Sequence, residues 1–358
     1  MVINIKTIKR IFCNVCCKNK PVCSIKPFGS YYNAYFGLIK TALRQINIAP
    51  YSIRYALFAD FIWYHFIEKY YRKPNVLKRI KKRAANGKKI IWNLHNKIPH
   101  EAKDVAKAKE FMREVAVVAH KIVIHCNEST EIVKEICAGN QTILDKIVFV
   151  SHPNYIGIYG NEQKDSALTN SKLSLCFFGA VKKYKNIELL ITAVNELNFK
   201  DVELKIIGRC RSISYARHLK NLIGKNGNII TDFRFVKDKE IPQIVANSHL
   251  FVLPYNLNSS LNSGATILAF SYSRSVISSL TGTLADIEHK NLFFAYSYKD
   301  ENEHKEKLKE QIITIRQKYN GNYNELLRLG ENCKKYVCEN NSIQQVARQL
   351  TKVFRKVV

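Results

Sequence analysis

The chain alternates short apolar runs with amphipathic helical segments in both of its halves, and this alternation restricts it to α/β architectures. The apolar runs are typical of buried strands. They lie near residues 89–94, 121–126, 147–150, 174–179, 202–208, 228–231, 250–254, 275–279 and 292–296. Because strands separated by helices pair in parallel, the pattern predicts α/β folding around parallel sheets.

The length of the chain indicates two domains. Its 358 residues are 46% hydrophobic, which is enough for two separate cores. A polar stretch containing Gly and Asn follows His152-Pro153-Asn154-Tyr155 and is typical of a linker. We therefore predict four parts, with the final helix returning to the first domain. These are an N-terminal domain at 1–155, a linker at 156–171, a C-terminal domain at 172–340 and a last helix at 341–358.

Positive charge is concentrated in the N-terminal part. The net charge is +28, yet the first 100 residues contain 20 Lys and Arg and only Asp60 and Glu68 as acids. A basic block near Tyr70 and Tyr71 contributes Lys78, Arg79, Lys81, Lys82 and Arg83. Such a block is often a solvated face, but here it predicts binding to anionic headgroups, at about 1 kcal/mol for each Lys or Arg near the surface.

Cysteine and apolar patterns indicate where the protein works. Ten irregularly placed cysteines without a secretory leader favour a reducing compartment and free thiols. The group Cys13, Cys16, Cys17 and Cys23 lacks a partner pair at zinc-ribbon spacing, so free thiols are favoured over a structural zinc. No apolar run reaches the roughly 18 residues needed to span a bilayer. We expect a cytoplasmic protein bound peripherally to the inner face of the membrane.

Two strand ends carry residues suited to a diphosphate. Gly179 ends one apolar run, and Lys182 and Lys185 follow it at the strand's carboxyl end, where open α/β sheets bind ligands. Cations are disfavoured at a helix start unless an anion is present, which favours phosphate binding over a solvated face. Arg209, which follows Gly208 at another strand end, is a weaker candidate.

A second anion site is predicted where Ser263-Gly264 opens a helix. Unpaired first-turn amides and the positive end of the helix bind anions. We expect the amides of Ser263, Gly264, Ala265 and Thr266 to point at the same diphosphate, and Asn262, Ser263 and Thr266 to hydrogen-bond phosphate or ribose.

A series of short motifs extends from about Asn33 to Glu288. The motifs are Asn33-Ala34-Tyr35-Phe36, Ile91-Trp92-Asn93-Leu94-His95-Asn96, Pro99-His100-Glu101, His152-Pro153-Asn154-Tyr155, Phe178-Gly179, Tyr184-Lys185-Asn186, Ile206-Ile207-Gly208, Phe235-Val236, Glu240-Ile241, Pro254-Tyr255, Ser263-Gly264 and Val276-Ile277. No single motif is specific, but their order and spacing are. In this order and spacing the chain resembles the GT-B glycosyltransferases, and within them the bacterial exopolysaccharide and capsule transferases related to family 4 and to xanthan-type glucuronosyltransferases.

The resemblance implies a fold and a reaction. The fold is GT-B, with two Rossmann-like domains whose parallel sheets face each other across a cleft. The reaction expected from the resemblance transfers a hexosyl unit from a UDP- or GDP-sugar to a glycan or polyprenyl-diphosphate-linked glycan during capsule, exopolysaccharide or surface-glycan synthesis. Neither a metal nor another cofactor is expected, because Lys182, Lys185 and the Gly264 loop match the family's diphosphate-binding positions.

The resemblance also implies an acceptor site. His95 follows a buried strand and matches the family's cleft histidine, so it would accept the acceptor's proton or orient the sugar. A structural histidine bonded to backbone explains it equally well. His100 and Glu101 are further candidates; a carboxylate base would suit inversion, but Glu101 also suits the first turn of a helix.

One departure leaves the stereochemistry and the nucleotide open. Family-4 members carry two glutamates around the glycine loop, whereas Asn256 to Asp286 contains none. A nucleotide-sugar 2-epimerase of the same fold is an alternative, although its carboxylates cannot be placed. A basic nucleic-acid-binding protein is least favoured, because no recognition motif is present, and we expect no nucleic-acid partner.

Overall fold

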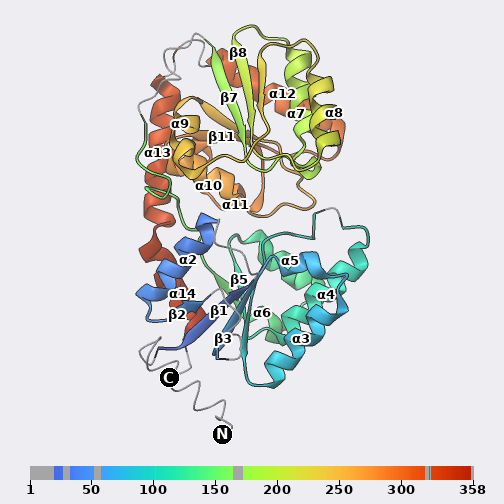
Figure 1. The fold of residues 1–358 in the computed structure, drawn as a ribbon, viewed down its shortest axis with the longest axis vertical. Helices are drawn as coiled ribbons and strands as arrows, with labels where there is room; N and C mark the ends of the chain where they lie inside the picture. The colour runs from blue at the N-terminus through green and yellow to red at the C-terminus, as the bar shows by residue number, and fades with distance from the viewer. Residues whose placement is uncertain are drawn as a thin grey trace. The chain divides into compact units, whose positions relative to one another are not determined.

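The computed structural model describes residues 20–26, 33–51, 58–100, 102–163, 172–318, 322 and 324–355 (Figure 1). The chain divides into two compact units. Unit 1 comprises Met1–Pro153 with Asn341–Val358, and unit 2 comprises Asn154–Asn340. Cys13, Cys16, Cys17 and Glu101 lie outside the described residues, as does 164–171 of the expected linker.

Unit 1 contains a six-stranded sheet in the order β2-β1-β3-β4-β5-β6. All of its strand pairs are parallel. The strands are β1 (Val22–Lys26), β2 (Ala49–Tyr51), β3 (Phe61–His65), β4 (Lys89–Asn93), β5 (Lys121–Ile124) and β6 (Ile147–Phe149). β1 and β3 to β5 are almost wholly buried, as expected for a sheet that helices cover on both faces.

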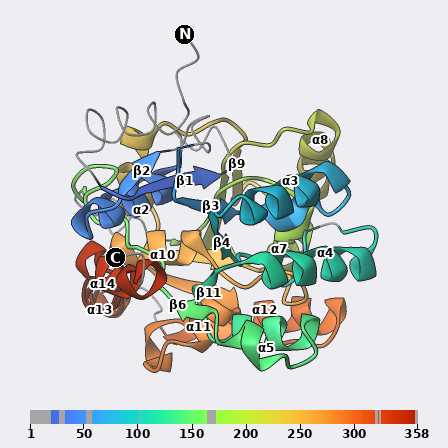
Figure 2. The same ribbon diagram turned by 90° about the horizontal axis from the view of Figure 1, so that it is seen from below.

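Helices cover both faces of this sheet. They are α2 (Ala34–Gln45), the 3-10 helix η3 (Ile67–Tyr70), α3 (Pro74–Ala85), α4 (Val105–Val118), α5 (Glu128–Ile136), α6 (Gln141–Leu144) and α14 (Ile343–Phe354). Figures 1 and 2 show α2 and α14 together on one side of the sheet and α3 and α4 on the other. The apolar faces of α2 and α14 share one core with the sheet, which includes Ile39, Leu43 and Leu350.

Unit 2 repeats the arrangement with the strand order β12-β11-β10-β7-β8-β9, again all parallel. The strands are β7 (Leu173–Phe178), β8 (Val202–Ile207), β9 (Ile229–Asp232), β10 (Leu250–Leu253), β11 (Ser275–Ser279) and β12 (Phe294–Tyr296). Two parallel six-stranded sheets confirm the α/β prediction.

The helices that connect or follow the strands of unit 2 pack on both faces of its sheet (Figure 1). They are η5 (Lys183–Lys185), α7 (Ile187–Leu197), α8 (Ile213–Ile223), η6 (Asp238–Glu240), α9 (Ile241–Ala246), α10 (Gly264–Ser271), α11 (Gly282–Ala285), η7 (Lys290–Leu292), α12 (Glu301–Lys318) and α13 (Asn324–Asn340). The core contains Leu190, Ile191 and Leu250, all fully buried.

The helix that follows β4 begins later than expected. The helix expected from about Glu101 begins at Val105, because the side chain of Asp104 accepts a hydrogen bond from the Lys107 amide and caps the helix there. Within the described residues, no helix is long and apolar enough to cross a membrane.

Candidate active site

The carboxyl ends of β7 and β8 approach each other through two glycines. Gly179 and Gly208 have φ angles of 143° and 142°. Residues that carry a side chain rarely adopt this backbone conformation. A Cβ atom on Gly208 would lie 1.8 Å from the carbonyl oxygen of Gly179. Glycine is therefore required at Gly208, and Arg209 follows it as an exposed side chain.

Lys185 lies against the loop that follows β10. Its Nζ is 4.1 Å from the centroid of the Tyr255 ring, a cation–π distance. The neighbouring Asn186, in left-handed conformation, donates from Nδ2 to the Pro254 carbonyl at 2.9 Å. These two contacts fasten the β7 loop to the β10 loop. Lys182 is exposed, with its Nζ 5.6 Å from the Tyr184 ring.

The amino end of α10 joins the same cluster through Tyr255. The Ser263 hydroxyl donates to the Tyr255 hydroxyl oxygen at 3.0 Å and accepts from the Thr266 amide at 3.0 Å. Gly264 and Ala265 are the first residues of α10, so their amides have no carbonyl partner within the helix. The structure thus brings Lys185 and the Gly264 loop together in unit 2, with the half-buried Asn262 beside them.

The prediction that four successive amides face an anion is wrong for two of them. The Thr266 amide donates to the capping hydroxyl of Ser263 at 3.0 Å. The Ser263 amide donates to the Thr283 Oγ1 at 3.1 Å. The physical reason is that a side-chain cap satisfies first-turn amides as well as a ligand does. The hydroxyls of Ser263 and Thr266 also bond to each other, at 2.9 Å.

The position of this cluster in the sheet is typical of a ligand site. β7 lies between β8 and β10, so the chain leaves β7 in one direction and later returns on its other side. Ligands of open α/β sheets bind outside the carboxyl ends of the strands at such a switch point. Burial, followed by the charge of Lys182, lowers the pKa of Lys185 to about 8. An anion at this place would reverse that shift.

Unit 1 assembles four histidines at the carboxyl ends of neighbouring strands. His65 ends β3, and His95, His125 and His152 follow β4, β5 and β6 shortly after each ends. The first three recur at thirty-residue intervals, one in each strand-helix repeat. Parallel pairing of β3 to β6 places them along one edge of the sheet.

Hydrogen bonds and ring contacts connect these histidines. His65 Nδ1 lies 3.1 Å from His95 Nε2, and the His95 ring stacks on Phe66 with 3.8 Å between centroids. The Tyr35 hydroxyl is 2.9 Å from His125 Nε2. Because His125 Nδ1 donates to the Val150 carbonyl at 2.6 Å, its neutral ring accepts at Nε2.

All four histidines are held neutral at physiological pH. Burial lowers the pKa of His125 to about 4 and that of His152 to about 3. Burial, with the neighbouring histidines, also holds the pKa of His65 and His95 well below the usual value. Such rings orient and accept hydrogen bonds without adding charge.

A buried carboxyl group positions His95. Glu68 Oε1 accepts from the His95 amide at 3.1 Å, and burial raises the pKa of Glu68 to about 7. Of the other acceptor-side candidates, His100 is half-buried in the loop beyond His95, and Glu101 lies outside the described residues. Among the described residues, no three His, Cys, Asp or Glu are grouped to hold a metal ion.

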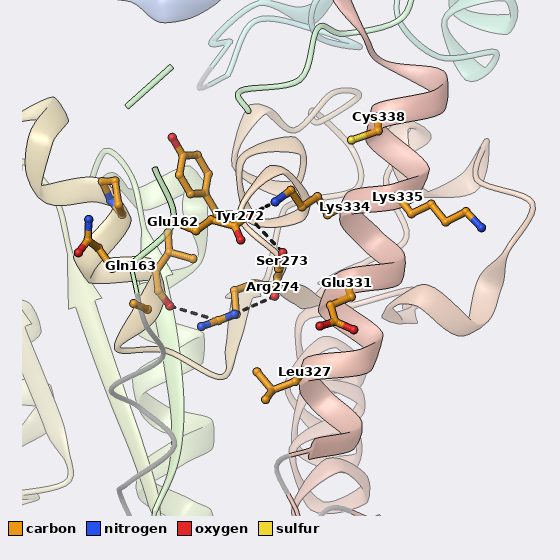
Figure 3. A pocket seen from close by; sticks show the side chains of 13 residues that line it. Glu162, Gln163, Tyr272, Ser273, Arg274, Leu327, Glu331, Lys334, Lys335 and Cys338 are labelled. Carbon is orange, nitrogen blue, oxygen red and sulfur yellow. Dashed lines mark hydrogen bonds and ion pairs between the residues drawn. The ribbon is translucent and has the colours of Figure 1, made fainter. Parts of the chain in front are cut away.

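A cavity of about 440 Å³ in unit 2 lies at the other end of the sheet (Figure 3). Ala246 and Arg274 line it, just before the amino ends of β10 and β11. Arg274 donates to the carbonyls of Val245 and Ser248, and Lys334 pairs with Glu162 at 2.8 Å. Because it lies at the amino ends of β10 and β11, away from the cluster around Lys185, this cavity is not part of the candidate site.

Comparison with known proteins identifies the second half of the chain. Residues 172–318 match the family described as "Glycosyl transferases group 1". This region contains β7, η5, β10 and α10, hence the whole cluster around Lys185. The chain carries a glycosyltransferase domain of group 1 type.

Solved structures show that the chain has a GT-B fold. Anabaena HepE in complex with UDP and glucose superposes with a TM-score of 0.70 at 13% identity, covering 94% of this chain and 100% of HepE. Sucrose-phosphate synthase from Thermosynechococcus elongatus gives a TM-score of 0.70 at 12% identity, covering 94% and 99% of the two chains.

A curated relative is the GDP-mannose:glycolipid 4-beta-D-mannosyltransferase of Xanthomonas campestris pv. campestris. It is 22% identical over 239 residues, which cover 63% of this chain. The similarity spans 64% of the relative's own length.

Several residues at the two sites were not predicted from the sequence. Tyr255 links Lys185 to Ser263, while His65, His125 and Glu68 surround His95. Their sequence signal was present but weak: each of the two histidines closes an apolar strand-like run. Contacts between residues this far apart in the chain cannot be read from local periodicity.

Proposed function

We propose that the protein transfers a hexosyl unit from a nucleotide-diphosphate sugar to a glycan acceptor, carried on a polyprenyl diphosphate or a related lipid. The donor binds in unit 2 and the acceptor in unit 1. The GDP-mannose and glycolipid in the relative's name, and the UDP and glucose bound to HepE, support this choice of substrate classes.

One observation carries the proposal: Lys185, Tyr255 and the start of α10 meet at the switch point of the unit 2 sheet. The departing diphosphate gains negative charge in the transition state. A preorganised ammonium group and the amides of Gly264 and Ala265 would stabilise that charge. We propose that they, with Lys182 and Arg209, perform the charge neutralisation that a metal ion provides elsewhere.

The histidine cluster suits the acceptor side. With its pKa held far below neutrality, His95 is a poor proton acceptor at physiological pH, so its proposed role is to orient the acceptor sugar. His100 and Glu101 remain the proposed groups for proton transfer. The lipid-linked acceptor places the enzyme at the inner face of the cell membrane, in capsule, exopolysaccharide or surface-glycan synthesis.

The test replaces Lys185 by Ala. Removing a charge that acts mainly in the transition state costs about 3 kcal/mol, so turnover should fall roughly a hundredfold. Lys183→Ala is the matched control, because Lys183 belongs to the same turn but its Nζ lies 6.0 Å from the ring of Tyr215 on α8. The measurement is kcat with a panel of UDP- and GDP-sugars, with circular dichroism to verify folding.

Wild-type turnover in Lys185→Ala would refute the assignment of the diphosphate site. The donor nucleotide is identified separately by thermal shift with UDP, GDP and ADP, because a ligand that binds the native state raises Tm. Mass spectrometry of the products checks the reaction class, since transfer enlarges an acceptor whereas epimerisation does not.

A further inference from the structure

Unit 1 contains a second concentration of cations, in a cavity that no proposed donor residue lines. The cavity has a volume of about 280 Å³ and lies between the carboxyl ends of β1 and β3 and one face of α3. Its lining residues are Lys26, Tyr64, His65, Ile67, Tyr70, Lys73, Val76, Arg79, Ile80 and Arg83. Four of these are cations, and none is a carboxylate.

The cations of this cavity affect one another. Burial, followed by the charge of Arg83, lowers the pKa of Lys26, which is half-buried at the end of β1. Arg83 donates to the Tyr64 hydroxyl at 2.5 Å, which holds the guanidinium at the wall. Like charges gathered at a cavity without an acid raise its affinity for anions, because only an anion relieves their repulsion.

The basic block of α3 is divided between two surroundings. Arg79 and Arg83 are four residues apart, so they share the helix face that lines the cavity. Lys81 instead pairs with Glu114 of α4 at 2.5 Å. Lys78 and Lys82 are exposed and do not line the cavity. The helix thus places a subset of its charges at this site, which a uniformly solvated basic face would not do.

The topology of the sheet supports a ligand at this position. β1 pairs with β2 on one side and with β3 on the other, so the unit 1 sheet also has a switch point, between β1 and β3. The cavity opens where those two strands end, the position at which open parallel sheets bind ligands. Its volume is close to the lower limit for small-molecule pockets.

We propose that this cavity binds a phosphate monoester or diphosphate group through Lys26, Lys73, Arg79 and Arg83. Arginine forks match phosphate oxygens in pairs, and the Tyr64 and Tyr70 side chains supply hydroxyl and aromatic contacts. If the protein acts on a lipid-linked acceptor, as proposed above, the group bound here is the phosphate of that acceptor. The binding itself does not depend on the transfer reaction.

The test compares two pairs of substitutions on α3 and its cap. Lys73→Gln with Arg79→Gln removes two exposed cations of the cavity, and Lys78→Gln with Lys82→Gln removes two cations of the same helix outside it. All four side chains are exposed, so the core is untouched. The probe is inorganic pyrophosphate, titrated by calorimetry into the wild type and both variants.

We call the Lys73→Gln, Arg79→Gln variant the cavity pair and the Lys78→Gln, Lys82→Gln variant the control pair. In the cavity pair we expect the affinity of one pyrophosphate site to fall at least about tenfold, because hydrogen bonds to a charged group are lost. The control pair should change that site less than about twofold, since charges outside the cavity act only through screened solvent. Equal losses of pyrophosphate affinity in the cavity pair and the control pair would overturn the proposal. Lys185→Ala removes only the donor site in unit 2, so failure of this inference is distinguishable from failure of the proposed function.

A second arm identifies the source of the phosphate group. Co-sedimentation uses phosphatidylcholine vesicles with and without phosphatidic acid, a lipid monoester. Loss of vesicle binding in the cavity pair alone supports a lipid-borne group. Loss of pyrophosphate binding with unchanged sedimentation supports a soluble phosphate ester. Pyrophosphate binding that survives in the cavity pair contradicts both.

Discussion

Lys185 illustrates how one residue acquires its properties from its neighbours. Its position after a strand and a glycine was sufficient to predict that it binds an anion. The sequence does not show that its ammonium group lies over the Tyr255 ring, or that burial and the charge of Lys182 lower its pKa. The same surroundings that favour an anion therefore make the charge of Lys185 sensitive to pH.

The first prediction at this scale is an alkaline limit on activity. In the free enzyme the pKa of Lys185 is lowered to about 8, so the ammonium form is complete below that pH and lost above it. We expect kcat/KM for the donor to fall as pH rises through about 8, because kcat/KM reports the free enzyme. Lys185→Arg should shift this limb upward, since a guanidinium stays charged. An identical alkaline limb in both enzymes would exclude Lys185 as its cause.

Expectations about the first-turn amides of α10 failed where side-chain hydroxyls already accept from them. The amides of Ser263 and Thr266 were expected to bind an anion but are used within the protein, by Thr283 and by the Ser263 hydroxyl. Sequence identifies a helix start but does not show which first-turn amides a cap satisfies.

At the scale of elements, α13 packs on the turn between α10 and β11 through a glycine. A Cβ atom on Gly330 would lie 1.9 Å from the carbonyl oxygen of Ser273 and 2.5 Å from its carbon. Both are backbone atoms, so the helix or the turn must move to admit a side chain. This glycine is required by close approach, because its own φ is not in the left-handed region.

Gly330→Ala should therefore lower the free energy of unfolding by about 1–3 kcal/mol, the cost of overpacking a close contact. Gly37→Ala is the control. Gly37 is an exposed residue of α2, and a methyl group added there would meet nothing within 4 Å, so alanine should stabilise the protein by roughly 0.5–1 kcal/mol. Urea unfolding followed by circular dichroism measures both changes. Opposite signs are expected, and a neutral Gly330→Ala would contradict the packing argument.

The helix α3 shows what sequence can and cannot decide about an element. Its basic block was readable from the chain, but the helix itself was not predicted. Which of its cations line the cavity and which pair with α4 depends on packing against β1, β3 and Glu114.

For the whole molecule, the four clustered histidines of unit 1 make stability depend on pH. His65, His95, His125 and His152 have folded pKa values below the 6.5 of the unfolded chain. Below pH 6.5 these histidines bind protons in the unfolded chain but stay neutral in the folded protein. The free energy of unfolding therefore falls as the pH falls. Glu68, with its pKa raised to about 7, acts in the opposite direction over this range but is a single group.

We expect the urea concentration at the unfolding midpoint to decrease as the pH is lowered from about 7.5 to about 5.5. Each such histidine should lower the free energy of unfolding by up to about 1.4 kcal/mol per pH unit below 6.5. His152→Asn keeps a donor for the Pro153 carbonyl, which His152 Nδ1 contacts at 2.9 Å, and removes one titrating group. Its stability should depend less steeply on pH than that of the wild type. A variant as steep as the wild type would show that His152 does not contribute.

Local periodicity was enough to predict two parallel α/β sheets. It also predicted the strand ends after which Lys182, Lys185 and Gly264 lie. Both predictions follow from how apolar and polar residues alternate along a short segment. Tertiary structure alone decided that Lys185 meets Tyr255, that three histidines thirty residues apart adjoin, and that four cations share one cavity. These contacts depend on strand order and helix packing, which are set by the burial of residues distant in the chain.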